Sequence, residues 1–179
     1  MVTLAQLKQF APKAKGDDID YLNAAMVEFG IDTPIRQAMF MGQLCVECIE
    51  FTTFEEIWGP TKDQERYEGS VSLGNTEPGD GYKYRGFGAI QNTGRKNVTA
   101  ATADLGVDFV SHPELAATPE QRYRVSGWYW RKHNLNACAD IGDSRTCTRL
   151  INGPGMYREQ ERDAYFLGAA AAIGAQLAC

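Results

Sequence analysis

Residues 33–51 read TPIRQAMFMGQLCVECIEF and carry only three charged side chains. A helix with so few charges is expected to be buried on most of its sides. Thr33 is a typical capping residue, and Pro34 fits the first helical position because its missing N–H would have no partner there. The apolar run continues from Ile35 to Ile49. We therefore expect the central helix of the fold in this stretch.

Helix signals flank this segment on both sides. Before it, an amphipathic run from Ile19 to Phe29 follows two aspartates and ends at Gly30, a typical helix terminator. After it, caps and strong helix formers predict helices over 96–105 (closed by Gly106), 119–130 (after Thr118), 144–150 (after Asp143) and 158–173 (closed by Gly174). The sequence therefore predicts a mainly α fold.

A glycine-rich segment interrupts the helical pattern. Seven of the 18 glycines lie between Gly69 and Gly94, which excludes a long regular helix there. Its later part, 82–87, alternates aromatic, basic and small residues and suits a short hairpin or an ordered loop. We expect two helical lobes with this loop or hairpin region beside a cleft between them.

Composition limits the class of protein. The 179 residues suit a single domain, 1–179. The net charge of −5 has the wrong sign for a protein that neutralises phosphates, so nucleic acid is not an expected partner. No window reaches the ~20 apolar residues of a spanning helix. The first ten residues lack a signal-peptide pattern, so a role outside the cytoplasm would need another protein for release.

The inventory of reactive residues excludes several chemistries. Two histidines, with no HExxH, GxSxG or P-loop pattern, argue against histidine-rich metal sites, a serine triad and phosphate cradling. Cys45 and Cys48 form a CxxC without a second such pair, so we expect no zinc, other metal or cofactor. Cys138 and Cys147 are predicted to be buried free thiols, with a disulfide as the alternative for a periplasmic protein.

Carboxylates remain as the candidate reactive groups. Glu47 lies within the most apolar helix, where desolvation is expected to raise its pKa as a general acid requires. The alternative is an ordinary acidic patch at a helix end. Glu56 follows nine residues later, about 13.5 Å along an unbroken helix and on the opposite face. A catalytic pair therefore needs the helix to end between them, and the β-branched Thr52 and Thr53 are the expected place.

Several motifs, in this order, resemble glycoside hydrolase family 19, the chitinase-like family, and in particular its single-domain phage lysins. The resemblance extends from Leu22 to Ala170. The matching motifs are Leu22–Met26, Phe29–Ile31, Thr33–Pro34, Tyr67–Gly69, Leu73–Thr76, Pro78–Gly81, Tyr84–Gly88, Ile90–Arg95, His112–Leu115 and Ile151–Gly153. The resemblance implies a lysozyme-like, two-lobed helical fold.

The resemblance also implies roles for individual residues. Glu47 matches the general acid of the family, Glu56 the base that activates water, and Thr93 a hydroxyl that helps to hold this water. The positions that match sugar contacts are Tyr84, Arg85, Gln91 and Asn152. Glu68, in the following loop, is a rival for the base and otherwise a substrate-binding residue. The chain departs from the family motifs at Val46, at Cys48–Glu50 and at Phe87.

Each of these residues also has a structural alternative. Thr93 is a possible helix N-cap, and Asn152 a possible helix terminator before Gly153. Tyr84, Arg85 and Gln91 fit hairpin packing as well as cleft lining. The aromatic run 128–130 is expected in the core, because it lies on a well-capped helix.

Together these features predict a lysozyme-like hydrolase that cleaves β-1,4 bonds between N-acetylated aminosugars by inverting acid/base catalysis. The favoured substrate is peptidoglycan. A phage endolysin is expected to be a monomer made in the cytoplasm of its bacterial host. It would lyse the host from the periplasm after release through a separate pore-forming protein. The alternatives are a chitinase and a catalytically inactive glycan-binding module.

Overall fold

The computed structural model describes residues 1–177 and is mainly helical, as predicted. Its helices are α1 (Leu4–Phe10), α2 (Ile19–Glu28), α3 (Pro34–Glu47), α4 (Lys62–Glu65), α5 (Asp80–Lys83), α6 (Arg95–Leu105), the 3₁₀ helix η1 (Pro113–Ala117), α7 (Pro119–Lys132), α8 (Leu135–Asp140), α9 (Ser144–Asn152) and α10 (Glu159–Ile173). Within residues 1–177, every helix is too short or too polar to cross a bilayer.

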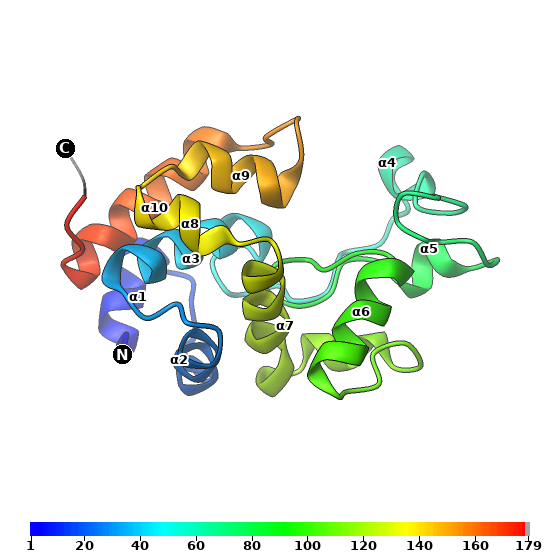
Figure 1. Ribbon diagram of the computed structural model, residues 1–179, viewed down its shortest axis with the longest axis horizontal. Helices are drawn as coiled ribbons and strands as arrows, with labels where there is room; N and C mark the ends of the chain where they lie inside the picture. Colours follow the sequence, from blue (N-terminus) through cyan, green and yellow to red (C-terminus); the bar gives the residue numbers. More distant parts are fainter. Residues whose placement is uncertain (178–179) are drawn as a thin grey trace.

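The helices form two groups on either side of α7 (Figure 1). One group contains α1, α2, α3, α8, α9 and α10, and in it α3 packs against α10 and α8. The other contains α4, α5, α6 and η1 and lies at the opposite end of the molecule from α10. The predicted two-lobed helical architecture is therefore confirmed.

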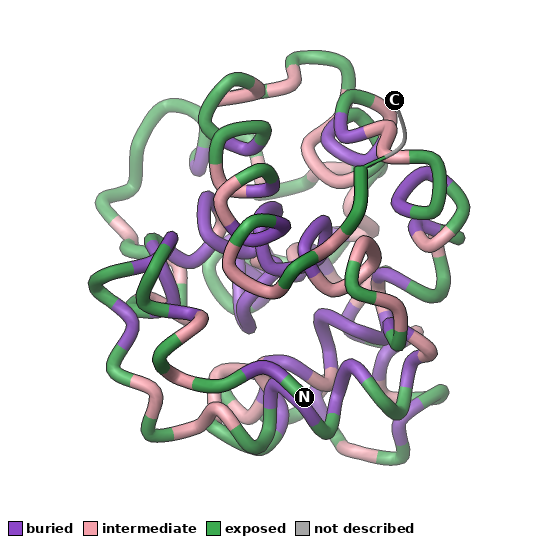
Figure 2. Tube along the Cα trace, turned by 90° about the vertical axis from the view of Figure 1, so that its left-hand side faces the viewer, coloured by how far each residue is buried: buried purple, intermediate pink, exposed green. Residues whose placement is uncertain are grey.

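The predicted central helix is α3. Thr33 accepts a hydrogen bond from the first turn, and Pro34 is the first helical residue, as expected. Every residue from Ala38 to Val46 is buried, and the ring of Phe40 packs edge-on against Trp130 at 5.2 Å between centroids. Figure 2 shows the buried positions gathered on the inward turns of the helices and the exposed ones on the outer loops. The scarcity of charge in this stretch is thus explained by burial.

The closest packing of α3 occurs at Gly42, where α10 passes. A Cβ atom added at Gly42 would lie 2.7 Å from both the Cα and the N of Phe166, so backbone would have to move. We expect Gly42→Ala to lower the free energy of unfolding by about 1–3 kcal/mol, despite the better helix propensity of alanine. Chemical denaturation of the variant and the wild-type protein measures this difference.

Gly155→Ala is the matched control, because a Cβ atom there meets nothing within 4 Å. The free energy of unfolding of this variant should remain within about 0.5 kcal/mol of the wild-type value. Equal stability of the two variants would contradict the close contact between α3 and α10.

The five predicted flanking helices are confirmed as α2, α6, α7, α9 and α10. Asp143 accepts a hydrogen bond from the amide of Thr146 at 2.9 Å, and Gly106 and Gly174 end their helices with left-handed backbone, both at φ 71°. The shorter helices α1, α4, α5, η1 and α8 were not predicted from the sequence. The capping box that starts α1, at Thr3, is a signal that was present but not used.

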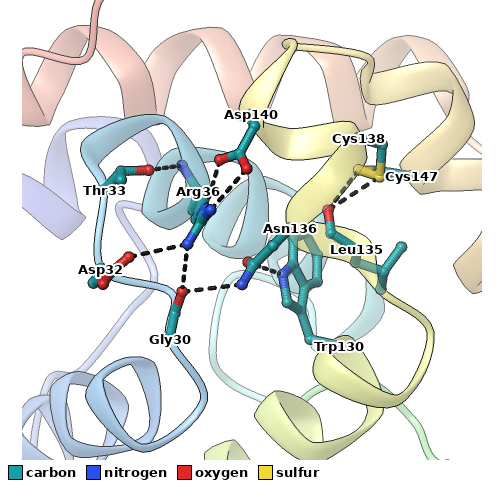
Figure 3. A network of polar contacts seen from close by, with 10 residues as sticks. All are labelled: Gly30, Asp32, Thr33, Arg36, Trp130, Leu135, Asn136, Cys138, Asp140 and Cys147. Atoms are coloured by element: carbon teal, nitrogen blue, oxygen red, sulfur yellow. Dashed lines mark hydrogen bonds and ion pairs between the residues drawn. A yellow bond between two sulfur atoms is a disulfide. The ribbon is translucent and has the colours of Figure 1, made fainter.

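A polar network joins the α2–α3 turn to α8 (Figure 3). The guanidinium of Arg36 donates to Asp140 Oδ2 at 2.7 Å, to Asp32 Oδ1 at 3.1 Å and to the carbonyl of Gly30 at 3.0 Å. The same carbonyl accepts a hydrogen bond from Asn136 Nδ2 at 3.0 Å. These contacts fix the start of α3 relative to α8.

The expectation of free thiols at Cys138 and Cys147 is wrong. The two residues form a disulfide between α8 and α9, with their Cα atoms 5.9 Å apart (Figure 3). Burial, which motivated the thiol prediction, is correct for both, but the sequence did not show that the α8–α9 turn brings the two sulfur atoms together. Cys45 and Cys48 are free and buried.

The glycine-rich segment forms ordered loops around one helical turn, α5. Phe87 pairs in antiparallel bridges with Asn92 and with Glu55, so the predicted hairpin exists as two isolated bridges. Gly94 has a φ of 92°, and a Cβ atom there would lie 2.7 Å from the carbonyl oxygen of Leu73. The close backbone approaches expected from the glycine content are therefore present.

Candidate active site

Glu47 and Glu56 lie at the two ends of a sharp turn that leaves α3. The helix ends at Glu47 rather than at 52–53, so the predicted end was several residues too late. The amide of Glu50 donates to the carbonyl of Cys45 at 2.8 Å, which closes the helix. Residues 49–51 then have left-handed backbone, with φ of 50°, 55° and 62°. The chain thereby reverses before the second carboxylate.

The carboxylate of Glu47 is held by a buried arginine. Arg162 Nη2 donates to Glu47 Oε1 at 2.6 Å, and the Arg162 side chain is only 1% exposed. Arg162 also donates to Gln43 Oε1 and to the carbonyl of Tyr157, both at 3.0 Å. Among residues 1–177, the hydrogen bonds to Glu47 all go to Oε1, so Oε2 is available to a substrate.

This environment differs from the expected one. The sequence predicted an apolar setting for Glu47, whereas the structure pairs it with the positive charge of Arg162. The reason for the difference is that Arg162 occupies an apolar position of α10, facing α3.

The carboxylate of Glu56 accepts three hydrogen bonds. The amide of Gly86 donates to Oε2 at 2.8 Å, Gln64 Nε2 donates to Oε1 at 2.9 Å, and the Tyr67 hydroxyl donates to Oε1 at 3.3 Å. These three donors fix the position of the carboxylate that is the candidate base. Burial, the charge of Glu56 and this hydrogen bond raise the pKa of Tyr67 to about 12, and the charge of Glu47 adds to the shift. The charges of both carboxylates therefore contribute to the raised pKa of Tyr67.

A pocket opens between the two lobes, and neither Glu47 nor Glu56 is among its lining residues. Its volume is about 380 Å³, and it is lined by Leu73, Ile90, Gln91, Asn92, Thr93, Asn97, Tyr129, Leu150, Ile151, Asn152 and Gly153. Three predicted site residues, Gln91, Thr93 and Asn152, therefore meet in one place. Burial and, second, the charge of Glu47 raise the pKa of Tyr129, one of the pocket residues. Side-chain amides dominate its polar lining.

Local contacts fix these three side chains. Thr93 Oγ1 donates to the carbonyl of Gln91 at 2.9 Å, and Gln91 Nε2 donates to the carbonyl of Gly88 at 3.0 Å. Asn152 Oδ1 accepts from the amide of Tyr157 at 2.6 Å. The alternative of Thr93 as a helix cap is wrong, since the residue preceding α6 is Gly94.

Two other predicted site residues have structural contacts instead. Tyr84 is 0% exposed, and its hydroxyl donates to the carbonyl of Val110 at 3.1 Å, so its prediction as a cleft residue is wrong. Glu68 accepts from the amides of Gly79 at 2.7 Å and Gly81 at 2.8 Å. Both of its oxygens thus bind backbone amides at the start of α5.

Arg85 supports the segment that carries Glu56. It is buried, donates to the carbonyl of Tyr82 at 2.8 Å and pairs with Glu55. Its guanidinium lies over the rings of Tyr82 and Phe87, 4.2 and 4.7 Å from their centroids. The prediction of a direct sugar contact for Arg85 is therefore not supported, because its donors are directed at protein atoms.

Three residues that contact the carboxylates were not predicted from the sequence: Arg162, Gln64 and Tyr67. For Arg162 a signal existed, because it shares one helical face with the buried Phe166 and Ala169. An arginine at an apolar position requires an anionic or polar partner. For Gln64 and Tyr67 no pattern indicated the contact, since both reach Glu56 through an irregular loop.

Glu50 connects the turn after Glu47 to the segment that follows α1 and to α10. Its buried carboxylate accepts from the amide of Lys13 at 3.1 Å, pairs with Lys13 Nζ at 3.0 Å and accepts from the Tyr165 hydroxyl at 3.1 Å. Burial alone raises the pKa of Glu50, but these hydrogen bonds outweigh it and leave the pKa below its ordinary value. The charged form thus stabilises the folded state.

We expect Glu50→Gln to lower the free energy of unfolding by about 1.5–3 kcal/mol at neutral pH. Because the folded pKa of Glu50 is depressed, its contribution is present above the ordinary carboxyl range and is lost as the pH falls through the folded value. The difference from the wild-type protein should therefore shrink as the pH is lowered below the ordinary carboxyl range. Denaturation at several pH values measures it, with the exposed Glu65→Gln as a control. A pH-independent difference would contradict the charged contact.

The comparisons with known proteins agree on one family. No family model matches the chain. A glycosyl hydrolase family 19 domain-containing protein of Haemophilus influenzae is 26% identical over 180 residues, which cover 86% of this chain and 88% of that protein. Similarity at this level extends over nearly the whole of both chains.

Solved structures share the fold. Chitinase C from Streptomyces griseus superposes with a TM-score of 0.79 at 21% identity, covering 99% of this chain and 78% of that one. A bacterial family 19 chitinase superposes with a TM-score of 0.77 at 21% identity, covering 99% of this chain and 97% of that one. The resemblance to glycoside hydrolase family 19 is therefore confirmed. The Haemophilus influenzae relative supports it in sequence, and the structure of the bacterial family 19 chitinase supports it in fold.

Proposed function

We propose that this chain is a glycoside hydrolase that cleaves β-1,4 bonds between N-acetylated aminosugars with inversion at the anomeric carbon. The observation that carries the proposal is the pair of carboxylates at the two ends of the turn. Glu47 has one oxygen free of hydrogen bonds from residues 1–177, and Glu56 is held in place by three donors. The family 19 relative and the family 19 chitinase fold support the same reaction class.

The two carboxylates divide the reaction between them. Glu47 protonates the glycosidic oxygen of the leaving sugar, and Glu56 takes a proton from a water molecule that attacks from the opposite face. Such a pair stands about 6.5–9.5 Å apart, which leaves room for the water. Once Glu47 has given up its proton, the guanidinium of Arg162 stabilises the carboxylate that forms. The Thr93 hydroxyl is the proposed second partner of the water.

The pocket between the lobes suits an aminosugar chain. The amide side chains of Gln91, Asn97 and Asn152 provide donors and acceptors for acetamido and hydroxyl groups. Peptidoglycan and chitin both contain β-1,4-linked N-acetylated aminosugars. The motif resemblance to single-domain phage lysins favours peptidoglycan, whereas the two structural neighbours are chitinases. We propose peptidoglycan as the substrate and chitin as the second candidate.

We further propose that the protein is a bacteriolytic endolysin of phage type, with a single catalytic domain that acts as a monomer. It would be made in the cytoplasm of the bacterial host and act on the cell wall in the periplasm. Release would depend on a separate pore-forming protein. The resemblance to phage lysins supports these proposals.

Product analysis tests the proposal. Purified Gram-negative peptidoglycan and colloidal chitin are incubated in parallel with the wild-type protein, and new reducing ends are counted and identified. We expect muropeptides from peptidoglycan, and the reducing sugar names the bond that is cut. Products from chitin alone would establish the chitinase alternative. Binding to either polymer without products would indicate an inactive glycan-binding module.

A further inference from the structure

Three aromatic side chains gather beside Glu56 on the lobe of α4 and α5. The ring centroids of Trp58 and Tyr82 lie 5.4 Å apart in an edge-on arrangement, and those of Trp58 and Tyr67 lie 6.1 Å apart. Tyr82 is 53% exposed, and Trp58 and Tyr67 are half-buried. In contrast, Trp128 and Trp130 are 1% and 0% exposed. Trp58 is therefore the one tryptophan of the chain outside the core.

The cluster is continuous with the candidate active site. Trp58 follows Glu56 by two positions, in the loop that precedes α4. Tyr67 joins the two, because its hydroxyl donates to Glu56 Oε1 and its ring lies beside Trp58.

The exposed ring of Tyr82 is held from one side. The guanidinium of Arg85 stacks on it at 4.2 Å, and Arg85 is itself fixed by Glu55 and by the ring of Phe87. This arrangement keeps the ring in place while leaving half of its surface exposed. An ordered aromatic surface of this kind is built to contact a partner rather than to fill a core.

We propose that Trp58 and Tyr82 form a sugar-stacking subsite at the α4–α5 end of the cleft, beyond Glu56. A pyranose ring in a β-linked aminosugar chain has an apolar face of C–H groups, which packs on aromatic rings, and a polar rim that remains in water. This inference rests on the proposed function. The subsite lies to one side of the reacting bond and contributes binding energy only when the chain is long enough to reach it.

Tryptophan fluorescence provides a test that is independent of turnover. The Glu47→Gln variant is titrated with the soluble hexamer and trimer of β-1,4-linked N-acetylglucosamine. We expect the hexamer to change the emission spectrum, and the further substitution Trp58→Phe to abolish this change, since Trp128 and Trp130 are buried. An identical change in the double variant would overturn the proposal.

Kinetics with a matched pair of variants provides the second test. Trp58→Ala should raise KM for long glycan strands about tenfold with little effect on kcat, whereas Trp58→Phe should restore most of the affinity. The control is Ile57→Ala, which removes a neighbouring apolar side chain that is 76% exposed but carries no aromatic ring. Hydrolysis of the trimer should be unaffected in all three variants.

The outcomes separate this inference from the proposed function. If the wild-type protein cleaves glycan strands and Trp58→Ala has the same KM as Ile57→Ala, the proposed subsite is wrong and the proposed hydrolase activity is retained. If the wild-type protein cleaves nothing and Glu47→Gln binds neither oligomer, both proposals fail. Equal loss of affinity for hexamer and trimer would place Trp58 at the reacting bond and overturn a distal subsite.

Discussion

Glu47→Gln should reduce turnover by about 10²–10⁴-fold while leaving oligosaccharide binding intact. Glutamine has nearly the same shape as glutamate and its side-chain oxygen can still accept the hydrogen bond from Arg162. It has no acidic proton to give to the leaving oxygen. Steady-state rates of reducing-end release, together with binding of the same oligosaccharide, separate the chemical step from affinity.

Glu55→Gln is the control for this substitution. Glu55 neighbours Glu56, is half-exposed and pairs with Arg85, so its loss removes a nearby negative charge without touching the proposed acid. We expect this variant to keep activity within about tenfold of the wild-type protein. A Glu47→Gln variant that retains comparable activity would exclude Glu47 as the general acid.

Glu56→Gln is expected to have an effect of similar size, about 10²–10⁴-fold in turnover. The neutral amide cannot take a proton from water, and its NH₂ group would face the donors that now surround the carboxylate. Binding should be weakened less than turnover. The same reducing-end assay measures the rate, and thermal unfolding confirms that the variant folds.

The parallel variant Glu68→Gln decides between the two candidate bases. Glu68 binds the amides of Gly79 and Gly81, so its substitution should lower stability rather than the rate of the folded enzyme. If Glu68→Gln abolished turnover at full stability and Glu56→Gln did not, the assignment of the base would be reversed.

The helical frame was largely predictable because its signals are local. Thr33 with Pro34, Asp143, Gly106 and Gly174 each mark a helix boundary through the backbone geometry that they favour, and all of these boundaries are confirmed. The end of α3 was predicted wrongly because its terminating residues, 49–51, adopt left-handed backbone without glycine. Contacts from distant segments, such as Lys13 and Tyr165 on Glu50, hold them there.

The candidate site was predictable only in part, because it is assembled from distant segments. The motif resemblance identified Gln91, Thr93 and Asn152, which meet in one pocket. It also selected Tyr84, which the fold buries. A hairpin pattern does not show which of its faces packs inward. Likewise, the partner of Glu47 comes from α10 and depends on packing that no local pattern encodes.

The configuration of the first-formed product tests the central claim, hydrolysis by two carboxylates with inversion. Fresh product of the wild-type protein acting on a soluble β-linked aminosugar oligomer is followed by ¹H NMR within the first minutes, before the anomers equilibrate. The account predicts that the new reducing end appears as the α-anomer, with Glu56 activating a water molecule opposite Glu47. Initial formation of the β-anomer would show retention and contradict this mechanism.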